Sequence, residues 1–226
     1  MFHHVTIPAN KRGRDFVVGD IHGHIDLLME ELSYEGFNPK QDRLFSVGDL
    51  IDRGPESLAC LKLLDSRWFF AVRGNHEQMM MDWAYGDGFD GWRSTFGGWT
   101  ETLDASQIAT WVERLGKLPI SMTVEGSDYK VGICHAEPCG FDWLAMISDP
   151  DCFQQMMWGR KVLRGEGDLR PVTGVDITVH GHTPISQTRR IGNRYFIDTG
   201  AGIGERLTLR NIAELVSEYK AFQSLL

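Results

Sequence analysis

Asp, Asn, Glu and His side chains are gathered in five short clusters at tight turns. The clusters occupy residues 19–24, 48–54, 73–77, 135–137 and 180–183. Carboxylate, amide and imidazole groups are ligands for Mn²⁺, Fe and Zn²⁺, and the sequence has no Cys-x-x-Cys pair that would favour a thiolate site. One Asp can bridge two ions through its two oxygens and hold them about 3.5–4 Å apart. A single cluster usually serves only its turn, but five together predict a site for two metal ions.

Each cluster follows a segment with the pattern of a short strand. These strands are predicted at residues 15–18, 44–47, 68–72, 129–134 and 176–179. Helices are predicted between the first three strands, at residues 26–34 and 56–64, so the first half has a βαβαβ order. Open α/β folds carry their sites at the carboxyl ends of parallel strands. An α/β fold would therefore bring the clusters together.

The remaining segments give fewer signals. Further strands are expected at residues 120–124, 195–198 and 207–209, with a helix after Leu103. Residues 164–174 have the composition of a loop. Residues 85–98 are rich in Gly, Asp and Trp and are expected to form an excursion or cap, and the sequence leaves open whether it is a mobile lid. The tail from Asn211 fits both a strand and a helix and is left open.

Composition limits the class of protein. The chain has 226 residues, of which 42% are hydrophobic and 24% charged, as expected for a single globular domain spanning residues 1–226. The net charge of −8 disfavours nucleic acid as a partner. There is no apolar run long enough for a signal peptide or a membrane span, so no membrane partner is expected. The four cysteines are expected to act as small apolar thiols in a reducing, cytoplasmic compartment.

The clusters together resemble a known family. The motifs GDIHGH, GDLIDRGPES, RGNHE, HAE and HGHT, in this order, resemble the PPP-type metallophosphoesterases, the serine/threonine protein phosphatases. The compact bacterial and phage members are most similar in length and motif spacing. The resemblance runs from about residue 15 to about residue 209. It implies the calcineurin-like fold, a β-sandwich flanked by helices, in a single domain.

The resemblance also implies the metal ligands. Asp20 and His22 would hold the first ion, and Asp49 would bridge both. The second ion would be completed by Asn75, His135 and His182. The two divalent ions would be Mn²⁺, with Fe, Zn or Ni as alternatives. A hydroxide shared by the ions would attack phosphorus in line, without a phosphoenzyme.

Further residues of the same motifs would act on the phosphate ester. Arg53 and Arg160, with Asn75, would bind the phosphate. His76 would be the general acid that protonates the leaving alkoxide, and Asp52 would pair with it. Arg73 is as consistent with a structural ion pair as with a substrate contact.

Several residues near the motifs have simpler interpretations. His180 is expected to be a strand-end residue, with His182 the ligand, and the role of His24 is left open. Glu77 and Glu137 are expected to orient their loops. The remaining expectations are core packing for Met79, Met80 and Met81, and exposure or disorder for His3 and His4.

The leading hypothesis is a metal-dependent phosphatase of phosphoserine and phosphothreonine in proteins, with phosphotyrosine or phosphohistidine as further substrates. The first alternative is a symmetrical diadenosine tetraphosphate hydrolase, a class that usually lacks the full DRG and RGNHE forms. The second is a non-catalytic metal-binding scaffold, which the complete set of ligands and the presence of His76 disfavour. The target phosphoprotein and the oligomeric state cannot be predicted from the sequence.

Overall fold

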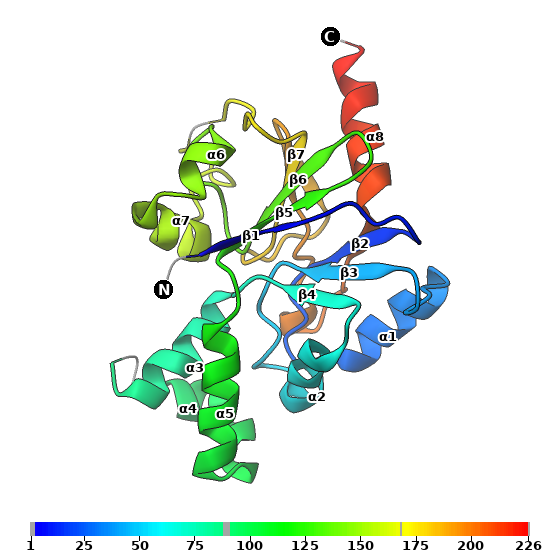
Figure 1. Ribbon diagram of the computed structural model, residues 1–226. Helices are drawn as coiled ribbons and strands as arrows, with labels where there is room; N and C mark the ends of the chain where they lie inside the picture. Colours follow the sequence, from blue (N-terminus) through cyan, green and yellow to red (C-terminus); the bar gives the residue numbers. More distant parts are fainter. Residues whose placement is uncertain (1–2, 88–90, 168, 226) are drawn as a thin grey trace.

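Two β-sheets and the helices around them make up the computed structural model, which describes residues 3–87, 91–167 and 169–225 (Figure 1). The smaller sheet has the strand order β10-β2-β3-β4, with β2, β3 and β4 parallel and β10 antiparallel. Its strands are β2 (Asp15–Val18), β3 (Arg43–Ser46), β4 (Phe69–Ala71) and β10 (Leu209–Asn211). Helices α1 (Ile25–Tyr34) and α2 (Ser57–Lys62) connect the three parallel strands, so the predicted βαβαβ order is confirmed.

The larger sheet has six strands in the order β1-β5-β6-β7-β9-β8. Its strands are β1 (His4–Ile7), β5 (Ser121–Glu125), β6 (Lys130–Cys134), β7 (Ile177–His180), β8 (Arg189–Ile191) and β9 (Arg194–Phe196). Strands β6 and β7 are parallel, so their carboxyl ends lie at the same edge. These ends lead into the two clusters that contain His135 and His182.

The sheets form a sandwich because their strands are buried on both faces. In β2, Phe16 and Val18 belong to an apolar cluster shared with the helices, whereas Val17 belongs to a cluster shared with the larger sheet. Strands buried on both sides are continuously apolar rather than alternating. The expected β-sandwich flanked by helices is confirmed.

The other helices, α3 to α8, fall into three groups (Figure 1). One group is α3 (Asn75–Tyr85), α4 (Trp92–Thr95) and α5 (Ala105–Gly116), at the lower left of the view. The second is α6 (Trp143–Met146) and α7 (Phe153–Trp158), at the upper left, and the third is α8 (Ile212–Gln223). Short 3₁₀ turns cover Leu63–Asp65, Gly97–Thr102, Pro150–Cys152 and Ala201–Ile203. Among the described residues, no helix is long and apolar enough to cross a membrane.

Several expectations for local structure need correction or completion. His4 is not exposed or disordered: it lies in β1, which pairs with β5, and its Nδ1 lies 2.9 Å from Ser121 Oγ. The tail from Asn211 forms the last strand residue and then α8, because Leu215, Val216 and Tyr219 at helical spacing reach the apolar cluster between the sheets. Residues 85–98 contain α4, and residues 88–90 of this segment lie outside the described part of the chain.

The expectation that all four cysteines act as apolar thiols is wrong. Cys139 and Cys152 form a disulfide with a Cα–Cα distance of 5.4 Å. Cys60 and Cys134 are free and buried. The disulfide connects the segment after β6 to the 3₁₀ turn that precedes α7, so it restrains the chain around α6.

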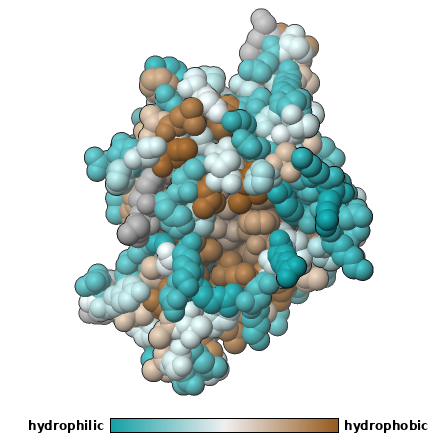
Figure 2. All heavy atoms as spheres, viewed as in Figure 1, coloured by the Kyte–Doolittle hydropathy of each residue, from teal (hydrophilic) through white to brown (hydrophobic). Residues whose placement is uncertain are grey.

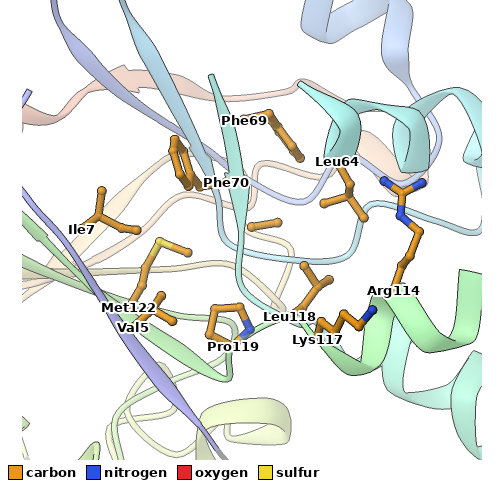
Figure 3. A pocket seen from close by; sticks show the side chains of 11 residues that line it. Val5, Ile7, Leu64, Phe69, Phe70, Arg114, Lys117, Leu118, Pro119 and Met122 are labelled. Carbon is orange, nitrogen blue, oxygen red and sulfur yellow. The ribbon is translucent and has the colours of Figure 1, made fainter. Parts of the chain in front are cut away.

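An apolar hollow opens on the face shown in Figure 2, where hydrophobic side chains are surrounded by hydrophilic ones. The hollow has a volume of about 360 Å³ and lies between the edge strands β1 and β4 and the end of α5 (Figure 3). Its lining residues are Val5, Ile7, Leu64, Phe69, Phe70, Ala71, Arg114, Lys117, Leu118, Pro119 and Met122. None of these is a predicted site residue, so the hollow is separate from the clusters described next.

Candidate metal and phosphate site

The five clusters meet where the parallel strands of both sheets end. Asp49 stands at their centre, with one carboxylate oxygen 3.5 Å from His22 Nε2 and the other 3.4 Å from His135 Nε2. The structure contains two groups of three residues whose ligand atoms, within each group, lie within 4.8 Å of one another. The first group is His22, Asp49 and His76, and the second is Asp49, His135 and His182. Asp49 is common to both groups, as a residue that bridges two ions would be.

Asn75 lies beside the second group. Its Oδ1 is 2.8 Å from His135 Nε2 and 2.8 Å from His182 Nδ1. This amide oxygen and the two imidazoles therefore converge on one point, beside Asp49. The three side chains are therefore close enough to share one ion, and their role as its ligands stays a prediction.

Asp20 lies between the two sheets and is held by the His182 loop. Its Oδ2 accepts a hydrogen bond of 3.0 Å from the backbone N–H of His182. Burial, with the neighbouring Asp198 and Asp49 carboxylates, raises the pKa of Asp20 well above its usual range. Three carboxyl groups gathered in one buried place repel one another, so a divalent cation among them would be strongly favoured.

Two of the three histidines expected to hold metal are neutral near pH 7, whereas the Asp49 carboxylate outweighs burial and raises the pKa of His135. Burial lowers the pKa of His22 to about 4 and that of His182 to about 3, so both are neutral near pH 7. His22 Nδ1 donates to the carbonyl of Ile51 at 2.8 Å, and His135 Nδ1 donates to the carbonyl of Val47 at 2.9 Å. With Nδ1 bound to a backbone carbonyl, the Nε2 atom of each ring faces the cluster. The donor set fits divalent metal ions.

The backbone of the site is unusual. Within the described part of the chain, the non-glycine residues with left-handed backbone are His22, Asp49, Asp52, Arg53 and His182, with φ between 46° and 73°. Every one of them is a predicted site residue. Left-handed conformations are unfavourable for residues with a Cβ, and they persist at functional sites where the surroundings enforce them.

Glycines in the motifs allow close approach to the carboxylates. A Cβ at Gly74 would lie 2.1 Å from Asp49 Oδ1, and one at Gly181 would lie 1.9 Å from Asp20 Oδ1. Either contact is far inside van der Waals distance. Glycine is therefore required at both positions for the carboxylates to keep their places.

Glu77 ties two of the strand-end loops together. Its carboxylate accepts hydrogen bonds from the backbone N–H groups of Asp49 at 2.9 Å, Leu50 at 2.8 Å and Gly74 at 2.8 Å. Its side chain is completely buried. Glu77 thus orients the loops, as the sequence suggested.

His76 and Asp52 form a closely hydrogen-bonded pair. His76 Nδ1 lies 2.7 Å from Asp52 Oδ2, which leaves Nε2 facing Asp49 at 4.0 Å. Although burial alone would lower it, the carboxylates of Asp49 and Asp52 raise the pKa of His76. The pairing expected from the sequence is present, and Nε2, the other ring nitrogen of His76, points into the cluster.

Two tryptophans that the sequence analysis did not single out also bind Asp52. Trp92 Nε1 donates to Oδ2 at 2.8 Å, and Trp99 Nε1 donates to Oδ1 at 2.9 Å. Trp92 lies in the Gly- and Trp-rich stretch of residues 85–98, and Trp99 directly follows it. Since a buried indole N–H needs an acceptor, two tryptophans in a glycine-rich segment were a signal that could have prompted a search for a buried carboxylate.

The two arginines expected to bind phosphate are exposed at the rim of the cluster. Arg53 Nη2 lies 3.5 Å from His76 Nε2, and Arg160 Nε donates to His182 Nε2 at 3.1 Å. The peptide groups after Arg160 are held by Glu137, which accepts from Lys161 N at 2.7 Å and Val162 N at 2.8 Å. Both guanidinium groups can therefore reach an anion bound over Asp49.

Other residues near the motifs have structural roles. Arg73 is buried and donates to the carbonyls of Leu115 and Gly116 at 3.2 and 2.8 Å and to Gln78 Oε1 at 3.0 Å, so among the described residues its hydrogen bonds are structural. His180 is buried at the end of β7 and lies 2.7 Å from Thr178 Oγ1. Met80 and Met81 are buried in the helical core, with Met79 packed against it.

Comparison with known proteins places the chain in a class. The model of the calcineurin-like phosphoesterase family matches residues 16–186. This range includes every predicted metal ligand from Asp20 to His182. The protein is a metallophosphoesterase, and the chain belongs to the calcineurin-like phosphoesterase family.

Two bacterial proteins and one solved structure are similar to this chain over most of its length. Serine/threonine-protein phosphatase 1 of Salmonella typhimurium is 39% identical over 87% of this chain and 91% of its own length. Serine/threonine-protein phosphatase 2 of Escherichia coli is 36% identical over 87% of this chain and 92% of its own length. A solved structure described as a candidate diadenosine tetraphosphatase has a TM-score of 0.71 at 20% identity, covering 95% of each chain, which shows the shared fold.

Proposed function

We propose that the protein is a metal-dependent phosphatase that hydrolyses phosphoserine and phosphothreonine in proteins. The observation that carries the proposal is Asp49, which lies 3.5 and 3.4 Å from imidazoles of the two ligand groups, beneath two exposed arginines. The bacterial relatives named serine/threonine-protein phosphatases, at 36–39% identity over most of the chain, support this substrate class.

The proposed metal ligands lie around Asp49. Asp20 and His22 would hold one divalent ion, and Asn75, His135 and His182 would hold the other, with Asp49 shared by both. Asp20 and Asn75 lie outside the two groups of ligand atoms, but each is hydrogen-bonded to His182. We propose Mn²⁺ as the metal, since its preference for oxygen and imidazole ligands matches this set. When bound, the two ions supply the positive charge that activates the attacking water and offsets the charge of the phosphate.

The other site residues bind the ester and move a proton. Arg53 and Arg160 bind the phosphate oxygens from the rim. We assign Asn75, whose Oδ1 lies 2.8 Å from His182 Nδ1, to the same group. His76 Nε2 delivers a proton to the leaving alkoxide, while Asp52 fixes the ring by accepting from Nδ1. This proton matters most for a serine or threonine alkoxide, because these are poor leaving groups.

The wider expectations stay predictions. They are a single domain over residues 1–226, activity on phosphotyrosine or phosphohistidine, and the absence of nucleic-acid and membrane partners. A cytoplasmic location is also a prediction, and the Cys139–Cys152 disulfide removes the cysteine argument that supported it.

The first test compares two substrates. The chelator-treated protein, with and without added Mn²⁺, is assayed on a phosphoserine peptide and on diadenosine tetraphosphate. We expect turnover of the peptide only when metal is present. Cleavage of the dinucleotide alone would transfer the protein to the tetraphosphatase class, and inactivity on both would favour a metal-binding scaffold.

The second test addresses His76. We expect the His76→Asn variant to retain metal and to lose about 10²–10⁴-fold in kcat on the phosphoserine peptide but much less on p-nitrophenyl phosphate, whose leaving group needs little protonation. An equal loss on both substrates would remove His76 from the general-acid role.

A further inference from the structure

Asp52 is held on both of its oxygens. Its side chain is completely buried, and it accepts three hydrogen bonds: from His76 and Trp92 at Oδ2, and from Trp99 at Oδ1. The three distances lie between 2.7 and 2.9 Å. A carboxylate bound at only one oxygen can rotate about its Cβ–Cγ bond, but donors on both oxygens fix its plane.

The two indoles belong to one short segment, residues 92–99. Trp92 is completely buried in α4, and a Cβ at Gly97 would lie 2.5 Å from its ring, so only glycine lets the chain pass over this indole. Phe96, between the two tryptophans, contacts the His76 ring edge-on at 5.0 Å between centroids. The segment therefore touches both members of the His76–Asp52 pair.

We propose that Trp92 and Trp99 are positioning residues for the general acid. By fixing the plane of the Asp52 carboxylate, they keep Oδ2 directed at His76 Nδ1 and so keep Nε2 directed at the leaving oxygen. This inference rests on the proposed function, because it acts through the assigned role of His76. It assigns residues 92–99 a part in turnover that no metal ligand or phosphate-binding residue provides.

The alternative is that the indoles only anchor α4 to the body of the protein. A structural anchor would affect all substrates equally when it is removed. A positioning role predicts a loss that grows as the leaving group becomes poorer, with KM unchanged. The two interpretations therefore differ in a measurable ratio.

The variants are Trp99→Phe and Trp92→Phe, which remove the indole N–H but keep an aromatic ring. Trp99 is only half-buried, so its variant is the one expected to fold without difficulty. The matched control is Trp83→Phe, because Trp83 packs against Trp92 at 5.2 Å between centroids and is itself half-buried. Each variant is assayed on the phosphoserine peptide and on p-nitrophenyl phosphate.

We expect Trp99→Phe to lower kcat on the peptide about tenfold and on p-nitrophenyl phosphate less than about twofold, with KM within about twofold on both. Trp83→Phe should match the unmodified protein. An equal loss on both substrates, or no loss on either, would overturn the positioning role.

A spectroscopic measurement tests the contact itself without using activity. In the ¹⁵N-labelled protein, with and without Mg²⁺ as a diamagnetic ion, the Nε1–H signals of Trp92 and Trp99 are assigned from the two Phe variants. We expect both signals to exchange slowly with solvent and to shift in Asp52→Asn, while that of Trp68 stays in place. Fast exchange or unchanged signals would overturn the contact.

The two experiments separate failure of the inference from failure of the proposed function. If His76→Asn shows no dependence on the leaving group, the general-acid assignment fails. If His76→Asn shows the dependence and Trp99→Phe does not, the assignment stands and the positioning role of the indoles is overturned.

Discussion

Glu77 and Glu137 are both buried glutamates that accept backbone N–H groups, but they serve different parts of the site. Glu77 binds the N–H groups of Asp49, Leu50 and Gly74, so it holds a proposed metal ligand directly. Glu137 binds the N–H groups of Lys161 and Val162, so it holds the chain that follows Arg160. Glu77 thus supports the strand-end loops, and Glu137 supports the chain after α7.

The surroundings of the two glutamates differ. Glu77 lies among the ligand carboxylates, and burial together with the Asp49 charge raises its pKa to about 7. Glu137 lies next to a segment that is also tied by the Cys139–Cys152 disulfide. We therefore expect changes at the strand-end loops to affect metal binding. Changes around Glu137 and the chain after α7 should affect only substrate binding.

The largest effect is expected from Glu77→Gln. An amide would present an N–H group to backbone N–H donors, so the two loops would lose an acceptor and gain a repulsive contact. We expect less than one metal ion per chain, a loss of activity of more than about 100-fold, and a decrease of about 2–4 kcal/mol in the free energy of unfolding. Metal analysis after gel filtration and denaturant unfolding measure these quantities.

The matched control is Glu113→Gln, at an exposed position on α5, which should behave as the unmodified protein. Full metal content and activity in Glu77→Gln would show that the loops keep their geometry without this carboxylate. The claim that Glu77 supports metal binding would then be wrong.

Removal of metal should separate the two regions without any mutation. Without cations the carboxylates of Asp20, Asp49 and Asp198 repel one another, so the loops that carry them should open more often. We expect faster hydrogen exchange in residues 20–23 and 49–54 and unchanged exchange in residues 161–164. The stability should return with Mn²⁺, by about 2.7 kcal/mol at one hundred times its dissociation constant. Equal acceleration in all three segments would contradict the separation.

A smaller effect is expected from Glu137→Gln. Loosening the chain after Arg160 should raise KM for the phosphoserine peptide about tenfold, with kcat within about threefold, because the change weakens binding of the phosphate rather than the reaction. Metal content should be unchanged. Glu166→Gln, an exposed change in the same region, is the control. Loss of metal in Glu137→Gln would mean that the two regions are coupled.

The smallest effect on turnover is expected from Cys139→Ser. If Glu137 holds Arg160 in place, loss of the disulfide should change KM less than about twofold. The free energy of unfolding should nevertheless fall by about 2–3 kcal/mol, because the disulfide closes a loop of 13 residues. Urea unfolding and steady-state assays measure both quantities, with the thiol-reduced protein for comparison. A rise in KM as large as that of Glu137→Gln would assign the support of Arg160 to the disulfide instead.

The ligand clusters could be predicted from the sequence because each lies directly after its own strand. Asp20, Asp49 and Asn75 follow three parallel strands, so local patterns are sufficient to bring them to one edge. The roles of Arg53 and Arg160 depended on a resemblance, since a single arginine has no local pattern that marks it.

Contacts between distant segments could not be predicted in this way. The bonds from Trp92 and Trp99 to Asp52 span 40 and 47 residues, and β1 pairs with a strand more than 100 residues away. No periodicity within a short window reports such pairs. The disulfide was missed for another reason: the inferred compartment argued against any pairing of Cys139 with Cys152.

The left-handed backbone at His22, Asp49, Asp52, Arg53 and His182 has a consequence for how the protein can evolve. Glycine would relieve about 1 kcal/mol at each of these positions, because it adopts positive φ without a steric cost. A library selected only for heat resistance would therefore accumulate glycine at these positions and lose its function. Variants that keep these side chains have lower thermal stability than the glycine variants but retain turnover. Stability and activity should therefore conflict most strongly at these five positions.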